Sequence, residues 1–247
     1  MAHLDRKGKR ALWTKARSGE QLYNTQLRAV ARQIGVLVKG IAPNGTLDKV
    51  GQLYKALQDY AKMIEPWAAS VAQVMLADVA RRDKQMWLRN SRAMGLGIRQ
   101  EVTNSPVSGV LSDLMDEQVV LIKSLPLKAA ERVHELSLQS LSNSMRASEV
   151  AKAIMETENV TAARARLIAR TEVTRASSNL LQVRAQHAGS DGYIWRTSGD
   201  SDVRDSHKAM EGKYVRWSEP PTLDKLTGHA GTLPNCRCFS EPIFPDD

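Results

Sequence analysis

The sequence predicts a mainly α-helical protein with a small α+β module at its carboxy-terminal end. Up to about residue 190, apolar residues recur at helical spacing, and glycine or proline interrupts the pattern at intervals. After Gly189 the pattern changes to short β-like runs separated by Gly, Asp, Pro and Ser. Aromatic residues are scarce, so the core must rest mainly on Leu, Val, Ile, Ala and Met. We therefore expect a helical amino-terminal region followed by long helices packed on short antiparallel strands.

Helical spacing and its interruptions locate the individual helices. They are expected at about residues 9–39, 47–64, 66–94, 108–123, 127–144, 148–157 and 161–187. Thr46 and Ser148 are the expected N-caps of the second and sixth helices. Pro66 predicts a break near Glu65, and Pro126 is expected to separate two helices.

The carboxy-terminal segment carries the predicted strands. They are Tyr193–Trp195, Tyr214–Trp217 and Cys238–Phe244. The change of texture along the chain suggests two domains, residues 1–125 as a basic helical region and residues 126–247 as the carboxy-terminal module. A chain of 247 residues is long enough for either one large domain or two smaller ones.

Positive charge is concentrated in the first part of the chain. The formal net charge is +8, but residues 1–100 hold 18 Lys and Arg against 7 Asp and Glu, a net of +11. This asymmetry suggests a polyanion or an acidic surface as partner, and a solvated basic helix face is the alternative. The basic start of the chain is a candidate for contact with DNA phosphates. Because no nucleic-acid-binding fold signature surrounds it, any DNA binding there should be sequence-independent and salt-sensitive. The candidate DNA-binding residues are Arg6, Lys7, Lys9, Arg10, Lys15 and Arg17.

Other classes of protein are disfavoured by the composition. No stretch reaches the ~18 apolar residues that span a bilayer, and no apolar run follows the basic start, as a signal peptide would require. Two cysteines one residue apart do not make a disulfide framework. A soluble protein made in a reducing cytoplasm is the expectation.

Both cysteines and two histidines gather near the end of the chain. His207, His229, Cys236 and Cys238 supply the four nitrogen and sulfur ligands that a tetrahedral zinc ion takes. The single-residue gap between the cysteines is shorter than the usual zinc-finger spacing. In the alternative, the cysteines are small buried apolar residues and the histidines are polar surface groups.

A group of acidic residues precedes and surrounds His207. Asp200, Asp202 and Asp205 lie near this histidine, so a divalent-metal hydrolase or nuclease with His207 as general base is one interpretation. The other is a structured turn in which Asp200 caps the backbone and Arg204 pairs with an acid.

The last long helix carries a polar run from Ile168 to Ala176. Glu172 and Arg175 are three residues apart and share a helix face, whereas Arg170 and Glu172 do not. Such a pair either holds the β module by charge-assisted hydrogen bonds or is an ordinary surface pair.

Six elements together resemble the phage head morphogenesis domain of the Mu F-like minor head proteins. They are Ile168-Ala-Arg-Thr-Glu172, Trp195-Arg-Thr197, Gly199-Asp200, Arg204-Asp-Ser-His207, Gly212-Lys213 and Pro234-Asn-Cys-Arg-Cys238. The last of these is the most specific, and the resemblance covers roughly residues 130–244. Its motif positions in this chain include Arg170, Glu172, Trp195, Asp200 and Arg204.

The resemblance implies a minor capsid protein of a tailed phage or prophage, made in the host cytoplasm and present in the virion at the capsid interior or portal vertex. Portal protein, major capsid protein and double-stranded DNA are the implied partners, and no enzymatic activity is implied. The family commonly has a histidine directly before the Pro-Asn-Cys-Arg-Cys element, where this chain has Leu233. His229 is the candidate substitute, so zinc remains a hypothesis. The alternatives are a metal-dependent hydrolase built on Asp200, His207 and His229, and a DNA-binding accessory protein.

Overall fold

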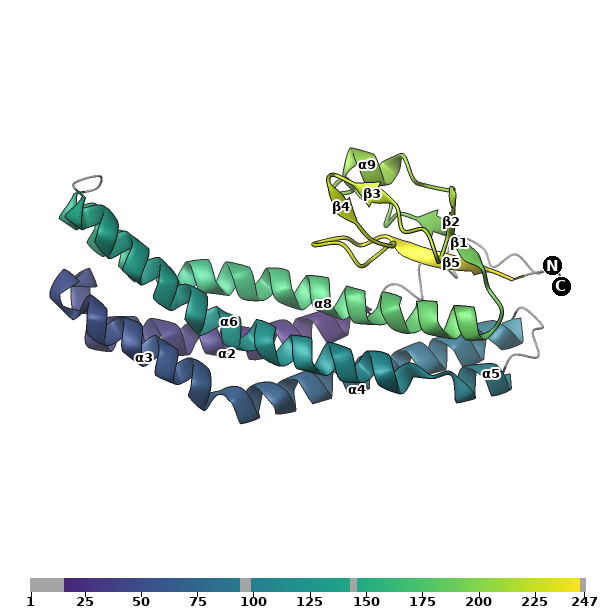
Figure 1. Cartoon of the computed structure of the whole chain (residues 1–247), viewed down its shortest axis with the longest axis horizontal. Coiled ribbons are helices and arrows are strands. Elements are labelled where there is room, and N and C mark those ends of the chain that lie inside the picture. Colours follow the sequence, from purple (N-terminus) through teal and green to yellow (C-terminus); the bar gives the residue numbers. More distant parts are fainter. Residues whose placement is uncertain (1–15, 94–98, 143–145, 245–247) are drawn as a thin grey trace. The chain divides into compact units, whose positions relative to one another are not determined.

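The structure of the chain, a computed structural model, describes residues 16–93, 99–142 and 146–244. It is mainly helical with a small antiparallel sheet near the carboxy-terminal end, as predicted (Figure 1). The helices are α2 (Ala16–Ile41), α3 (Val50–Met63), α4 (Glu65–Ala93), α5 (Arg99–Asn104), α6 (Val107–Leu141), α7 (Ala147–Met155), α8 (Thr157–His187) and α9 (Asp205–Lys208). Short 3-10 turns, Pro43–Gly45 and Leu47–Lys49, join α2 to α3. The strands are β1 (Gly192–Arg196), β2 (Tyr214–Arg216), β3 (Thr222–Leu223), β4 (Leu226–Thr227) and β5 (Phe239–Ile243).

The chain forms two compact units, each assembled from stretches far apart in the sequence. Unit 1 comprises Met1–Glu20, Val74–Leu114 and Arg170–Asp247, and unit 2 comprises Gln21–Gln73 and Met115–Ala169. The domain boundary expected between residues 125 and 126 divides the chain along its sequence, and it stays a prediction.

Unit 2 is a helical assembly with an aliphatic core. Its helices meet through the apolar stripes that the sequence pattern predicts. The fully buried residues include Leu27, Ile34, Leu53, Leu57, Ile122, Leu125, Val133 and Ile154. The Tyr23 hydroxyl donates to Gln118 Oε1 over 2.9 Å inside this core. At Gly45 (φ 72°) a Cβ would overlap the Ala151 backbone, so the turn before α3 requires glycine there.

Unit 1 contains the sheet and the helices that cover it. The strand order is β2-β1-β5 with antiparallel pairing, and Tyr193 of the central strand lies opposite Val215 and Pro242. Tyr193 and Trp195 are both fully buried, because alternate side chains of a strand point to the same face. The core that they enter also includes Trp87, Val102, Ala185, Val215, Trp217, Ala230, Leu233, Cys236 and Cys238. Residues of α4, α5 and α8 therefore complete the core of the strand-bearing part.

A buried ion pair lies among the helices of unit 1. Arg184 Nε donates to Asp83 Oδ2 over 2.5 Å, and the two side chains are 4 % and 3 % exposed. The same guanidinium donates to the Val102 carbonyl through Nη1. It thereby connects α8 to α4 and α5.

One predicted helix break is confirmed and one is wrong. Ile64 separates α3 from α4, and Pro66 lies in the first turn of α4, where a missing N–H costs no helical hydrogen bond. Pro126, by contrast, lies inside the continuous helix α6. Ile122, Leu125 and Ala129 are buried on either side of it. This packing offsets the hydrogen bond that proline removes, so the helix continues.

Of the two predicted N-caps, Ser148 is wrong. Thr46 stands at the N-cap position of the 3-10 turn Leu47–Lys49, but its hydroxyl donates to the Pro43 carbonyl and makes no capping hydrogen bond. Ser148 lies within α7, whose N-cap is Arg146, and the Arg146 N–H donates to the Glu149 carboxylate. The small β3–β4 hairpin was not expected, because its turn residues Asp224 and Lys225 adopt positive φ without glycine or asparagine.

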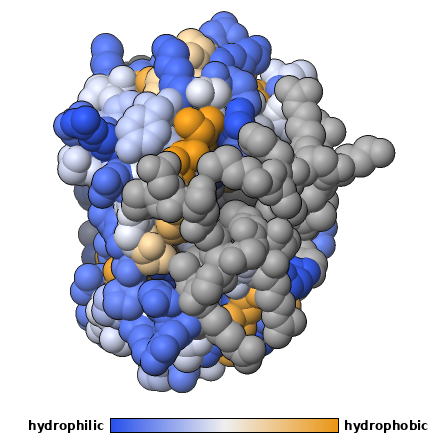
Figure 2. Space-filling model, turned by 90° about the vertical axis from the view of Figure 1, so that its right-hand side faces the viewer, coloured by the Kyte–Doolittle hydropathy of each residue, from blue (hydrophilic) through white to orange (hydrophobic). Residues whose placement is uncertain are grey.

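Among the described residues, no helix combines the length and apolar character needed to cross a membrane. On the face shown in Figure 2, hydrophilic residues predominate among the coloured side chains.

Candidate metal centre

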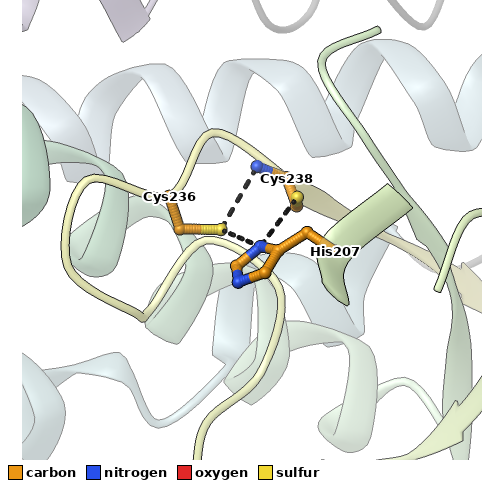
Figure 3. Close-up of side chains that lie close together, drawn as sticks. All are labelled: His207, Cys236 and Cys238. Carbon is orange, nitrogen blue, oxygen red and sulfur yellow. Dashed lines mark hydrogen bonds between the residues drawn. The ribbon is translucent and has the colours of Figure 1, made fainter. Parts of the chain in front are cut away.

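Three of the four residues predicted to bind zinc meet in unit 1. Potential ligand atoms of His207, Cys236 and Cys238 all lie within 4.8 Å of one another, and all three residues are buried. His207 Nδ1 lies 3.5 Å from Cys236 Sγ and 3.4 Å from Cys238 Sγ (Figure 3). Both sulfurs thus converge on a single ring nitrogen.

Local chain geometry explains how cysteines one residue apart reach the same point. Residues 236–238 lead directly into β5, and their side chains alternate in direction. The two sulfurs face His207, while the Arg237 guanidinium donates to Asp200 Oδ1 (2.8 Å) and Asp202 Oδ2 (3.2 Å). The Cys-x-Cys segment therefore presents two sulfurs to one histidine ring.

His207 reaches the cysteines from the short helix α9. The ring is 2 % exposed, and Trp195 packs edge-on against it with centroids 5.6 Å apart. Within the described part of the chain, His207 Nε2 is buried without a hydrogen-bond partner. The polar contacts of the imidazole are therefore made on the Nδ1 side. The expectation of a surface histidine is wrong for this residue.

The pKa values of the two thiols are shifted in opposite directions. The hydrogen bond from the Cys238 thiol lowers the pKa of the Cys236 thiol against the effect of burial, and backbone N–H groups of Cys238 and Gly231 act in the same direction. The same pairing, together with burial, raises the pKa of the Cys238 thiol well above its ordinary value. These contacts favour the thiolate form of Cys236, which is the form that binds metals.

His229 is not part of this group. Its Nδ1 lies 3.2 Å from the Tyr193 hydroxyl and its Nε2 lies 3.1 Å from the Trp217 carbonyl. Burial lowers the pKa of this imidazole. Both ring nitrogens are therefore used to hold the sheet, and the structure does not bring His229 to the cysteines as a fourth ligand.

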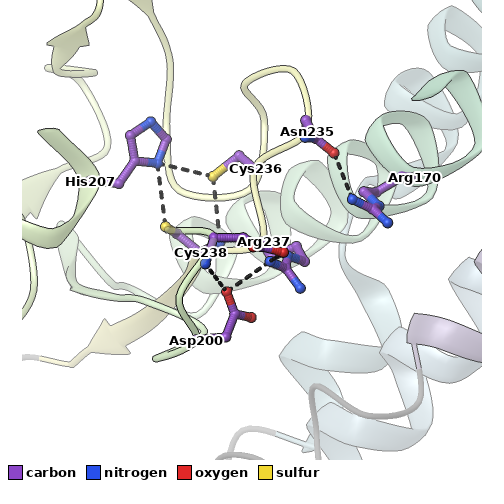
Figure 4. Close-up of polar contacts among 8 residues, drawn as sticks. Arg170, Asp200, His207, Asn235, Cys236, Arg237 and Cys238 are labelled. Carbon is purple, nitrogen blue, oxygen red and sulfur yellow. Dashed lines mark hydrogen bonds and ion pairs between the residues drawn. The ribbon is translucent and has the colours of Figure 1, made fainter. Parts of the chain in front are cut away.

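The loop that carries the cysteines is clasped by residues of the family motif (Figure 4). Arg170 of α8 donates to Asn235 Oδ1 over 3.0 Å, and the Asn235 N–H donates to Thr171 Oγ1 over 3.0 Å. Arg204 donates to the Pro234 carbonyl over 3.3 Å. These contacts hold the loop between α8 and the segment before α9.

The acidic group has the role expected of a structured turn. Asp200 Oδ1 accepts from the Asp202 N–H, and Arg204 pairs with Asp224. The hydrolase hypothesis instead requires Asp200, His207 and His229 to converge. Across the described ranges these three do not form a group of ligand atoms within 4.8 Å. The geometry therefore favours a structural role for this turn.

The remaining predicted site residues have separate positions. Glu172 is buried on α8 and accepts from Arg175 over 2.7 Å, within the same helix. Arg6, Lys7, Lys9, Arg10 and Lys15 lie outside the described residues, and Arg17 belongs to the start of α2. The DNA-binding assignment of these residues stays a prediction.

Two residues whose backbone conformation shapes the loop were not singled out from the sequence. Asn235 adopts φ 57°, a left-handed conformation that asparagine tolerates, and Gly231 adopts φ 82°. A Cβ at Gly231 would lie 2.9 Å from the Cys238 carbonyl oxygen. The sequence features that indicate such a turn are the asparagine after a proline and the glycine before the loop.

The six motif elements meet in one arrangement. It is an antiparallel sheet packed against helices, with a Cys-x-Cys loop held by hydrogen bonds. Residues 131–241 match the family described as Phage Mu protein F like protein. This stretch is a Mu F-like phage head morphogenesis domain, as the sequence motifs indicated.

A bacterial relative extends the comparison beyond the domain. An uncharacterized protein of Haemophilus influenzae is 26 % identical over 200 residues, which cover 79 % of this chain. The match takes in 44 % of that protein, so the chain spans less than half of the relative's length. No solved structure matches this chain.

Proposed function

We propose that this chain acts as a minor head protein of a tailed phage or prophage, in head assembly at the portal vertex or capsid interior. The observation that carries the proposal is the Mu F-like domain at residues 131–241. Portal protein and major capsid protein are its proposed partners.

The contacts of the polar residues support a structural role over a catalytic one. Asp200 is engaged by Arg237, His229 by Tyr193 and Trp217, and Arg170 by Asn235. A general base must instead be free to take a proton from a bound substrate. The motif residues thus maintain the shape of the domain, which suits a component of an assembly.

The proposal is tested on particles. Virions of the phage that encodes this chain are purified and searched for it by mass spectrometry, beside particles made after deletion of its gene. We expect the chain in mature heads, and defective or empty heads in its absence. A chain missing from mature heads, together with normal DNA content in the deletion, would refute a virion role.

We further propose that the basic amino-terminal part lies against packaged DNA. Its support is the net charge of +11 over residues 1–100. Sequence-independent binding should weaken steeply with salt, because each neutralised phosphate adds a slope of about −0.9 in log affinity against log salt.

A charge-matched pair of variants tests this contact. In the first, Arg6, Lys7, Lys9 and Arg10 are all replaced by glutamine, and the slope with a random-sequence duplex should become shallower by about 3 to 4. The control removes the same charge from exposed positions of the carboxy-terminal module, namely Lys208, Lys213, Arg216 and Lys225. Equal changes in both variants would show that net charge alone, not the amino-terminal segment, determines binding.

A further inference from the structure

The buried group formed by His207, Cys236 and Cys238 has the composition of a soft-metal site. Thiolate and imidazole ligands select zinc over magnesium or calcium, which prefer oxygen. The three side chains come from two separate segments, α9 and the loop before β5. Such a site would join these segments by bonds stronger than any hydrogen bond between them.

The observed spacings agree with a tetrahedral zinc ion. With Zn–S bonds of about 2.3 Å and Zn–N bonds of about 2.0–2.1 Å, the sulfur-to-nitrogen edge of a tetrahedron is about 3.5 Å. The corresponding distances here are 3.5 Å from Cys236 Sγ and 3.4 Å from Cys238 Sγ to His207 Nδ1. The two edges therefore already have the length that one shared ion requires.

Hydrogen bonds alone account poorly for this arrangement. A ring nitrogen offers one hydrogen or one lone pair, and both point along a single direction in the ring plane. It makes one good bond to sulfur, not two, and sulfur is a weak partner. No described residue bonds His207 Nε2, which is buried as well. A cation shared by both sulfurs and Nδ1 gives all three atoms a strong partner at once.

We propose that His207 Nδ1, Cys236 Sγ and Cys238 Sγ hold one zinc ion, with the fourth coordination position left to a non-protein ligand such as water. Two thiolates balance the charge of the ion, so the buried group becomes neutral. The ion fastens the Pro234–Cys238 loop to α9 and thereby fixes the loop that Arg170 and Arg204 clasp. This inference does not depend on the proposed role in the phage head.

The first test measures zinc in the full chain, purified without chelator. We expect one equivalent per chain by elemental analysis, and its loss in Cys236→Ser and in His207→Ala. The matched control is His229→Gln, which removes the contacts to Tyr193 and Trp217 in the same module but no proposed ligand. It should retain the metal. Zinc that persists in a Cys236→Ser/Cys238→Ser double variant would overturn the proposal.

A second test uses the unsubstituted chain, so that a variant that fails to fold does not affect the result. After removal of metal under reducing conditions, Co²⁺ is added and the visible spectrum is recorded. We expect the thiolate charge-transfer and d–d bands of tetrahedral cobalt at one equivalent, displaced on addition of Zn²⁺. Absence of these bands, together with no affinity for Zn²⁺ in a competition titration, would refute the site.

The oxidation state of the sulfurs separates the proposal from a disulfide. The chain is denatured with chelator and alkylated without reductant, and its mass is measured. Two alkyl groups are expected, because zinc keeps both sulfurs as thiolates. A chain from reducing cells that takes up none would contain a Cys236–Cys238 disulfide, and the metal site would be excluded.

Discussion

Replacing Arg184 with methionine should destabilise unit 1 strongly, and more at pH 8 than at pH 5. Arg184 and Asp83 are almost completely buried, and the guanidinium also donates to the Val102 carbonyl. Burial raises the pKa of Asp83 from 3.8 to about 6, because lost hydration outweighs the stabilising hydrogen bond from Arg184. The carboxyl is therefore charged at pH 8 and mostly protonated at pH 5.

The size of the effect follows from what the substitution leaves behind. At pH 8, the Arg184→Met variant would leave the Asp83 carboxylate buried without its cation, which costs about 3–5 kcal/mol. Without Arg184 the pKa of Asp83 rises further above 6. At pH 5 the carboxyl is neutral in both proteins, so the cost falls to the unsatisfied carbonyl of Val102, about 1–3 kcal/mol.

The sign of the pH dependence is also determined. A carboxyl whose pKa is raised in the folded state stabilises the fold fully below its unfolded value of 3.8, and this contribution is lost as pH rises through about 6. In the Arg184→Met variant the loss continues to higher pH. The gap between variant and parent therefore widens from pH 5 to pH 8.

Urea unfolding of the full chain at the two pH values measures this gap, with fluorescence of the buried Trp87, Trp195 and Trp217 as the signal. The control is the double variant Asp83→Asn/Arg184→Met, which has no carboxylate at this position, so this site should contribute no change in its stability between pH 5 and pH 8. A single-variant penalty that is equal at pH 5 and pH 8, or larger at pH 5, would refute the assignment to the buried charge.

Three further outcomes are expected. Gly51→Ala in α3 should raise stability by about 0.5–1 kcal/mol, because the site is exposed and open. Gly231→Ala should lower stability by more than about 1 kcal/mol, because φ is 82° and a Cβ would collide with its neighbours. Thermal unfolding of the two variants measures both changes. Asn235→Ala should cost about 1–2 kcal/mol in left-handed strain beyond the lost Arg170 contact, so Asn235→Gly should be the milder change in urea unfolding. Burial lowers the pKa of His229 below 6.5, so stability should fall as pH drops below that value, and NMR titration of the ring should find it neutral where an exposed histidine is charged.

Local pattern was sufficient for most elements of the fold. Apolar periodicity predicted the main helices and the three strands of the larger sheet, because burial of one face imposes that pattern on the sequence. It failed at Pro126, where buried neighbours keep α6 continuous, and at the β3–β4 hairpin, whose turn lacks the usual residues. In both places an interaction beyond the local segment, or an uncommon backbone conformation, decides the outcome.

The candidate metal site was predicted in part. Counting cysteines and histidines selected His207, Cys236 and Cys238, which the structure brings together. The same count included His229, which instead bonds Tyr193 and Trp217. A histidine carries no local sign of which partner its ring nitrogens will meet, since that depends on the packing of β1 and β2 around it.

The sequence by itself determined the helical class, the change to strands after Gly189 and the Mu F-like character of the carboxy-terminal part, because these depend on periodicity and on residue order. Only the tertiary structure decided that Trp87 and Val102 enter the core of the strand-bearing unit, and that Arg184 meets Asp83. It also decided that two sulfurs and one imidazole converge. These are contacts between residues far apart along the chain, and their partners are chosen by packing and charge burial in the folded state, which no local pattern encodes.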